Sequence, residues 1–115
     1  MFKIIFYRKH NGESPIEDFL NSLDVKMRKK ALMEIRLLKE FGNALRRPFS
    51  EPLGQGIFEL RIQSANNISR ILYFFYTGEN IILTNGFIKK TQKTPVQEIA
   101  IALKYKADYE SRKGD

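Results

Sequence analysis

The chain has no cysteine among its 115 residues. Disulfide bridges, zinc–thiolate sites and thiol nucleophiles are therefore excluded. The lack of disulfides fits a protein of the cytoplasm, which is the location we expect. Histidine is nearly absent too. The single one, His10, falls in a loop after the first apolar run, so we assign it no catalytic role.

Long apolar runs are also missing. The first residues, MFKIIFYRKH, hold only a short one, so we expect neither a signal peptide nor an interaction with membranes. No repeat, low-complexity segment or linker interrupts the sequence, and its length suits one hydrophobic core. We therefore predict a single domain over residues 1–115. No Gly-rich phosphate loop and no Ser/His/Asp set is visible, so we expect no metal and no other cofactor.

Cationic side chains are abundant. Lys and Arg together number 20 against 13 Asp and Glu, which gives a net charge of +7 and an isoelectric point near 9.7. Such an excess favours binding to polyanions through attraction and counterion release. Many small basic proteins bind no nucleic acid, however, so the position of the charges decides the interpretation.

The pattern of apolar residues predicts an α+β fold of order β-α-α-β-β-β-α, with a small, mostly antiparallel sheet and helices packed against it. Ser14-Pro15-Ile16-Glu17 forms a capping box that should start the first helix, and Thr94-Pro95-Val96-Gln97 repeats this logic before the last. Asp24 can cap the second helix, which Gly42-Asn43 should end. We predict strands at 2–7, 57–63, 68–77 and 81–88, and helices at 15–22, 25–41 and 95–109.

Four further features belong to this assignment. Residues 43–56 are rich in Pro and Gly, so we predict an irregular connection there. The last residues, 111–115, should fray. The second helix should have one apolar face, formed by Met27, Ala31, Leu32, Ile35 and Leu38. Its opposite face should be basic and carry Lys26, Arg28, Lys29, Lys30, Arg36 and Lys39.

The register of the predicted hairpins brings two arginines together. A four-residue turn at 64–67 pairs Gln63 with Ile68 and places Arg61 directly opposite Arg70. A turn centred on Gly78-Glu79 then places Phe87 opposite Arg70. Two guanidinium groups that face each other on a sheet repel unless an anion lies between them. We therefore interpret the pair as part of an anion-binding pocket.

Three lysines reach the same edge of the sheet. The strand that ends at Ile88 continues into Lys89-Lys90, and Lys93 follows before the last helix. The pocket would then contain Arg61, Arg70, Lys89, Lys90 and Lys93. A register shift of one residue would instead send the arginines to opposite faces as ordinary solvated charges. Gly86 would either allow a ligand to approach closely or relieve packing against a helix.

The same residues resemble a known family. The segments Glu51-Pro52-Leu53-Gly54, Phe58–Ile62 and Arg70–Phe74, and above all Gly86–Pro95 with its KKTQKTP sequence, are similar to the RelE/ParE toxin superfamily, in particular to its phage-derived HigB-like branch. The resemblance covers nearly the whole chain and implies a RelE-like fold. Members are toxins of type II toxin–antitoxin systems. RelE- and HigB-like members cut mRNA in the ribosomal A site, whereas ParE-like members inhibit DNA gyrase.

The resemblance also implies roles for individual residues. Arg70 matches the arginine that contacts the scissile phosphate, Arg61 and Lys93 match two further basic positions, and Glu51 matches a carboxylate that some members use as general base. Several relatives place a catalytic His or Tyr near the end of the last strand, where this chain has Ile88, Lys89 and Lys90. The general acid and base therefore stay open.

Metal-independent cleavage of RNA starts with attack of a 2′-hydroxyl on the adjacent phosphate. It needs a base, cationic donors for the developing charge, and an acid for the leaving oxygen. The arginines suit the second role, Lys93 or Lys90 the third, and Glu51, or else Glu59, the first, unless these glutamates only pair with the arginines. The residues that we expect to bind RNA phosphates, including those of rRNA, are Lys89, Lys90, Gln92, Arg46, Arg47, Lys29 and Lys30.

We accordingly predict a ribosome-dependent mRNA endonuclease, or mRNA interferase, that inhibits translation. Its partners would be the ribosome, mRNA and a helix-turn-helix, HigA-like antitoxin, and it would meet operator DNA only through that antitoxin. Two alternatives stay open on the same fold: a ParE-like inhibitor of DNA gyrase, and a nucleic-acid-binding module without catalysis.

Overall fold

The computed structural model describes residues 1–91 and 93–113. In this part of the chain, five strands form one sheet in the order β1-β5-β4-β3-β2, in which β1 and β5 are parallel and the other neighbours are antiparallel. The predicted α+β class is confirmed. The strands are β1 (Lys3–Phe6), β2 (Ser50–Gly54), β3 (Ile57–Ser64), β4 (Asn67–Tyr76) and β5 (Asn80–Ile88), and the helices are α1 (Pro15–Ser22), α2 (Val25–Phe41), a short 3₁₀ turn (Gly42–Ala44) and α3 (Val96–Lys113).

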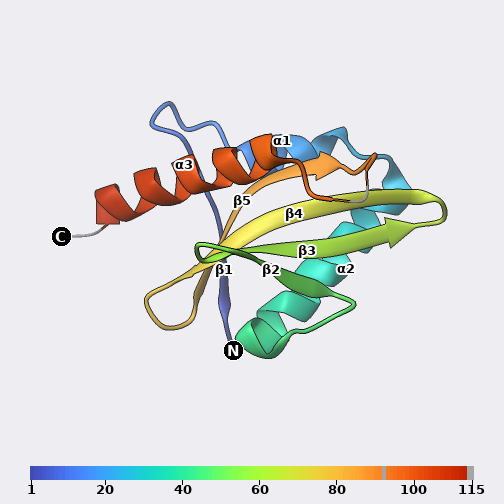
Figure 1. Cartoon of the computed structure of the whole chain (residues 1–115), viewed down its shortest axis with the longest axis horizontal. Coiled ribbons are helices and arrows are strands. Elements are labelled where there is room, and N and C mark those ends of the chain that lie inside the picture. The colour runs from blue at the N-terminus through green and yellow to red at the C-terminus, as the bar shows by residue number, and fades with distance from the viewer. Residues whose placement is uncertain (92, 114–115) are drawn as a thin grey trace.

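Helices cover both faces of the sheet (Figure 1). Helices α1 and α2 pack on one face, where alternate residues of β3 and β4, such as Leu60 and Tyr73, join their core. Helix α3 packs on the other face over Ile57 and Phe74. Because successive strand residues point to opposite faces, Arg61 and Arg70 lie on the α3 face.

The helix starts follow the predicted caps. The Ser14 Oγ accepts a hydrogen bond from the Glu17 amide at 3.2 Å, and an Asp24 carboxylate oxygen accepts one from the Met27 amide at 2.8 Å. The third cap differs. Helix α3 begins at Val96 with its first-turn amides bonded to the Pro95 carbonyl, and the Thr94 hydroxyl donates to Glu59.

The two faces of α2 differ from the prediction at three positions. Leu32 is 50% exposed, and Glu34 is buried in its place. The burial centres on Met27, Ala31, Ile35 and Leu38, and at about 100° per residue Leu32 falls too far around the helix to join them. Arg28 is not a free surface cation, because its guanidinium donates to the carbonyls of Leu20, Asn21 and Leu23 at the end of α1.

The prediction of an irregular connection over 43–56 is wrong for its second half. Residues Ser50–Gly54 form the edge strand β2, which pairs with β3. Pro52 fits there, because an edge strand needs no donor on its outer side. This extra strand matters for the site, since it places Glu51 directly opposite Glu59 on the α3 face.

Two further predictions are resolved by packing. A Cβ on Gly86 would lie 2.3 Å from the Phe19 ring of α1, so this glycine allows close packing of a helix. Helix α3 continues to Lys113, and Arg112 near its end donates hydrogen bonds to Asp108 and to the Arg8 carbonyl. The predicted fraying from Ser111 is therefore wrong for residues 111–113, the part of this segment that the structure describes. Within residues 1–91 and 93–113, no helix has the length and apolar character needed to cross a bilayer.

Candidate functional site

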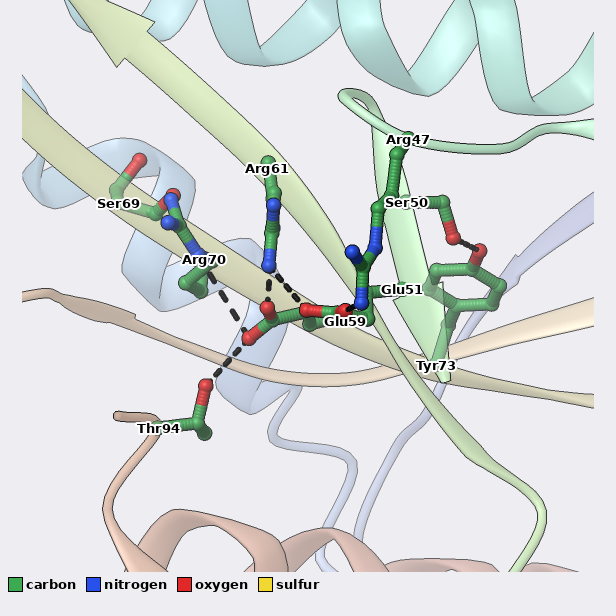
Figure 2. A network of polar contacts seen from close by, with 9 residues as sticks. All are labelled: Arg47, Ser50, Glu51, Glu59, Arg61, Ser69, Arg70, Tyr73 and Thr94. Carbon is green, nitrogen blue, oxygen red and sulfur yellow. Dashed lines mark hydrogen bonds and ion pairs between the residues drawn. The ribbon is translucent and has the colours of Figure 1, made fainter. Parts of the chain in front are cut away.

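The predicted register is confirmed. Arg61 of β3 lies opposite Arg70 of β4, and Arg70 lies opposite Phe87 of β5. The turn between β4 and β5 is centred on Gly78, one half-step from the predicted centre, and pairs Tyr76 with Asn80. A bulge between Leu72 and Tyr73 then shifts the register by one residue and brings Phe87 opposite Arg70. The two guanidinium groups therefore share the α3 face, beside the start of α3 (Figure 2).

An internal anion lies between the arginines. Glu59, only 1% exposed, has its carboxylate 3.1 Å from the Arg61 Nε and 3.6 Å from the Arg70 Nε. It also accepts a hydrogen bond from the Thr94 hydroxyl, which ties the start of α3 to the sheet. Figure 2 shows these three groups converging on this one carboxylate. Removing it would leave two guanidinium groups facing each other without the anion that lies between them.

A second carboxylate lies next to the first. Glu51 of β2 pairs with Arg61 through one oxygen and with Arg47 through the other. Its side chain is 20% exposed, so it lies at the rim while Glu59 lies inside. As a result, the cationic pocket predicted from the sequence is partly filled by the protein's own carboxylates. We call this set the arginine cluster: Arg47, Glu51, Glu59, Arg61, Arg70 and Thr94.

Arg70 is the most constrained member of the arginine cluster. It is 8% exposed, and burial lowers the pKa of its guanidinium although Glu59 opposes that shift. Its Nη1 donates to the Ser69 carbonyl at 3.0 Å, while its buried Nε has no hydrogen-bond partner among the described residues. Among these residues the Nε forms only the longer ion pair with Glu59 at 3.6 Å, so this guanidinium would gain from an added anion at hydrogen-bond distance.

Three cavities surround the two arginines, and each shares a lining residue with each of the other two. Arg70 and Lys89 line the loop cavity of about 380 Å³, together with Lys90. Lys89 also lines the glutamate cavity of about 270 Å³, together with Lys93 and both glutamates. The third, the edge cavity, has a volume of about 480 Å³ and includes Lys30, Glu34, Phe49, Arg61, Gln63 and Arg70.

The structure thus brings together the five cations of the predicted pocket. Lys89 stands out among the lysines, because burial, and then the charge of Arg70, lower the pKa of its ammonium group. The sequence indicated Lys89 only as a phosphate contact. A lysine with a lowered pKa between two cavities is also suited to proton transfer.

The other residues expected to bind RNA are more scattered. Arg46 and Arg47 are exposed on the loop before β2, where Arg47 pairs with Glu51. Lys30 pairs with Glu34 at 3.2 Å and lines the edge cavity, whereas Lys29 is exposed on α2 and does not line the three cavities. Gln92 lies outside the described residues.

Sequence reasoning missed three contributors. The Thr94 hydroxyl holds Glu59, although the sequence indicated it only as a helix cap. Glu34 reaches the edge cavity from α2, and Phe49 reaches it from the loop before β2. Glu34 was missed because the apolar pattern of α2 predicted Leu32, and not Glu34, on the buried face. A signal was present for Thr94, because it directly follows the lysines that border the pocket.

His10 does not line these three cavities, and its Nε2 lies 3.2 Å from an Asp108 carboxylate oxygen. Within the described ranges, no group of three or more His, Asp or Glu side chains is placed to hold a metal ion.

A small α+β domain with paired arginines and lysines at one end of its sheet has the charge pattern expected of polyanion-binding proteins. The chain belongs to the family described as phage derived protein Gp49-like (DUF891), whose model matches residues 18–107. This is a RelE/ParE-like toxin family, and the observed order of strands and helices is consistent with a RelE-like fold. A search of curated proteins found no match.

Proposed function

We propose that the protein is the toxin of a type II toxin–antitoxin system and that it cuts mRNA on the ribosome without a metal ion, in the manner of the HigB-like branch. Membership of a toxin-like family supports the first part. The observation that carries the second is the pair of facing arginines, one of them buried with an Nε that forms no hydrogen bond within the described chain, between three cavities that share lining residues.

The reacting phosphate would lie at the guanidinium groups of Arg61 and Arg70. A guanidinium presents a planar fork that matches two phosphate oxygens, and a donor fixed in a buried place stabilises charge as it develops. Arg70 is held by the Ser69 carbonyl and by Glu59, so it needs little rearrangement to receive a phosphate. Glu59 would stay in place as the group that positions both arginines.

Glu51 would leave Arg61 when the phosphate arrives. It is at the rim and holds Arg61 from the outer side, so a phosphate that takes its place would release its carboxylate beside the substrate. A released carboxylate could then take the proton of the attacking 2′-hydroxyl. Glu59 is less suited to be this base, because Arg61, Arg70 and Thr94 occupy it.

Lysines would complete the reaction. Lys89 has a lowered pKa and borders both the loop and the glutamate cavities, so it fits the general acid that protonates the leaving 5′-oxygen. Lys93 and Lys90, expected as acids from the sequence, line one cavity each and would stabilise the charge of the backbone. Arg46, Arg47 and Lys29 would contact phosphates of mRNA or rRNA.

Purified protein and a message provide the test, with and without ribosomes. Mapping of the 5′ ends should show cuts only when ribosomes are present. A message that stays intact while translation continues would rule the proposal out. Relaxed plasmid with intact message would instead support the gyrase alternative. A helix-turn-helix protein that binds the chain and blocks cutting would identify the proposed antitoxin.

A further inference from the structure

The edge cavity lies where β2 begins and leaves part of β3 uncovered. Strand β2 pairs with β3 only as far as Ser50 and Leu60, so among the described residues Ile62–Ser64 form the edge of the sheet. The cavity extends from Arg61 and Arg70 to Lys30 and Glu34 of α2. A chain whose phosphate reached the two arginines would therefore have space for a neighbouring group beside α2.

Glu34 gives this cavity an unusual polar lining. The residue is 6% exposed, its Oε2 pairs with Lys30 at 3.2 Å, and its buried Oε1 has no hydrogen-bond partner within the described chain. An ionised carboxylate only accepts hydrogen bonds, and a buried acceptor without a donor is unfavourable. The site would therefore gain from a ligand that brings donors.

The lining also contains a donor and an aromatic ring. The ammonium group of Lys30 lies next to the Glu34 carboxylate, and Phe49, 40% exposed, borders the same cavity. Flat nucleobases stack on exposed aromatic rings in the recognition of single-stranded RNA. Arginines for a phosphate, an aromatic ring for a base and a donor–acceptor pair for its edge together describe a nucleotide subsite.

Guanine fits this pair better than the other bases. Its Watson–Crick edge carries two neighbouring donors, N1–H and the N2 amino group, followed by the O6 acceptor. The two donors match a carboxylate and the acceptor matches an ammonium group. Adenine, cytosine and uracil each lack the two adjacent donors.

We infer that the edge cavity binds a guanine base next to the phosphate at Arg61 and Arg70, and that Glu34 determines this preference. The inference rests on the proposed function for its choice of RNA as the ligand. It assigns to α2 a role in recognising the base, which is separate from the chemistry at the arginine cluster.

Short RNAs test this directly. Binding of the trinucleotides UGU, UAU and UIU, where I is inosine, is measured by competition against a labelled RNA. Inosine lacks only the N2 amino group. From the value of a bidentate base contact, wild type should bind UGU roughly 5- to 100-fold more tightly than UAU, with UIU also weaker. Equal affinities, or no measurable binding of the three, would overturn the inference.

Three variants sharpen the result. Glu34→Gln should remove the preference for UGU, because its amide replaces one acceptor by a donor. Glu40→Gln, an exposed carboxylate of the same helix, should keep the preference and is the matched control. Phe49→Ala should weaken binding of all three RNAs without changing their order. A preference that survives in a folded Glu34→Gln protein would contradict the assignment.

Mapping of cuts separates the inference from the proposed function. Cuts that cluster beside guanine in wild type and lose that bias in Glu34→Gln support both. Ribosome-dependent cuts with no base bias would overturn the inference and leave the function intact. A preference for UGU in binding, with no cutting of any message, would refute the nuclease and leave the base site.

Discussion

Two polar networks lie on the α3 face of the sheet, and they differ in what they bury. The arginine cluster is one, beside the start of α3. The other, which we call the Tyr7 cluster, joins β1 and the loop after it to the second half of α3, and consists of Tyr7, His10, Asp108 and Arg112. Each borders a cavity of similar size, since a cavity of about 420 Å³ adjoins Tyr7, His10 and Asp108.

In the Tyr7 cluster, the buried group is neutral. The Tyr7 hydroxyl donates to Asp108 at 2.5 Å, and burial together with this bond raises the pKa of Tyr7 to about 12. The same bond lowers the pKa of Asp108. Both partners therefore keep their protonation states at neutral pH, and Arg112 adds its charge from the exposed side.

In the arginine cluster, the buried group is a cation. The pKa of Arg70 is lowered by burial, and its Nε has no hydrogen-bond partner among residues the structure describes. A protein retains a buried charge at a cost in stability, which is common where function needs it. The comparison teaches that a polar network beside a cavity does not by itself indicate a site. An incompletely satisfied buried cation is the stronger signal.

The largest expected effect concerns cutting. Replacing Arg70 by Ala should lower the single-turnover rate of mRNA cleavage roughly 100- to 1,000-fold, as loss of one fixed donor does at an oxyanion site. Arg112→Ala removes an arginine from the Tyr7 cluster and should leave the rate nearly unchanged. Circular dichroism verifies that both variants are folded. Equal losses in the two variants would remove the functional distinction between the clusters.

The next effect concerns stability. Glu59→Gln should lower the free energy of unfolding by about 3–5 kcal/mol, because it leaves two guanidinium groups without their buried counterion. Asp108→Asn should cost less, since its partners include a neutral tyrosine and an exposed arginine. Urea unfolding at pH 7 measures both. A larger loss for Asp108→Asn would reverse our ranking of the clusters.

An alkaline titration distinguishes the clusters by pH. The pKa of Tyr7 is about 12 in the folded protein and about 10 when unfolded, so unfolding releases a proton between these values. The stabilisation is complete below pH 10 and is lost as the pH rises towards 12. In Tyr7→Phe this part of the alkaline loss should disappear. Burial in the other core also raises the pKa of Tyr73 to about 12, against the opposing hydrogen bond with Ser50, so part of the loss should remain.

The smallest effect concerns lysine reactivity. Lys89 has a lowered pKa, so at pH 8 it should react with an amine-acylating reagent faster than the exposed Lys104 beside the Tyr7 cluster. Peptide mass spectrometry after brief labelling gives both rates. Single-stranded RNA should protect Lys89 more than Lys104. Protection of Lys104 alone would place the RNA beside the Tyr7 cluster and would contradict its assignment to the arginine cluster.

The sequence predicted much of this arrangement because it depends on local rules. Strand alternation and turn length placed Arg61 opposite Arg70, and the caps at Ser14 and Asp24 fixed two helix starts. The errors arose where distant contacts decide. Strand β2 depends on pairing with β3, and Pro52 in a Gly- and Pro-rich segment gave no sign of it. The place of Glu51, directly opposite Glu59, became visible only once that strand was paired.

The role of Glu59 shows the same boundary between local and tertiary information. Its place two residues before Arg61 put it on the face of that arginine, so it could be named as a candidate base. Its contacts with Arg70 and Thr94 come from β4 and from the start of α3, and these make it a holder of the arginines. Sequence spacing identified the residue, and packing between elements changed its role.

The central claim is that Arg61 and Arg70 hold the reacting phosphate. Its most direct test is a cryo-electron-microscopy structure of the protein on a ribosome whose message carries a 2′-O-methyl group at the cut site. We predict phosphate oxygens within hydrogen-bond distance of both guanidinium groups, with Glu51 moved away from Arg61. A ribosome-bound protein in which Glu51 still pairs with Arg61, and in which no phosphate reaches Arg70, would contradict the account.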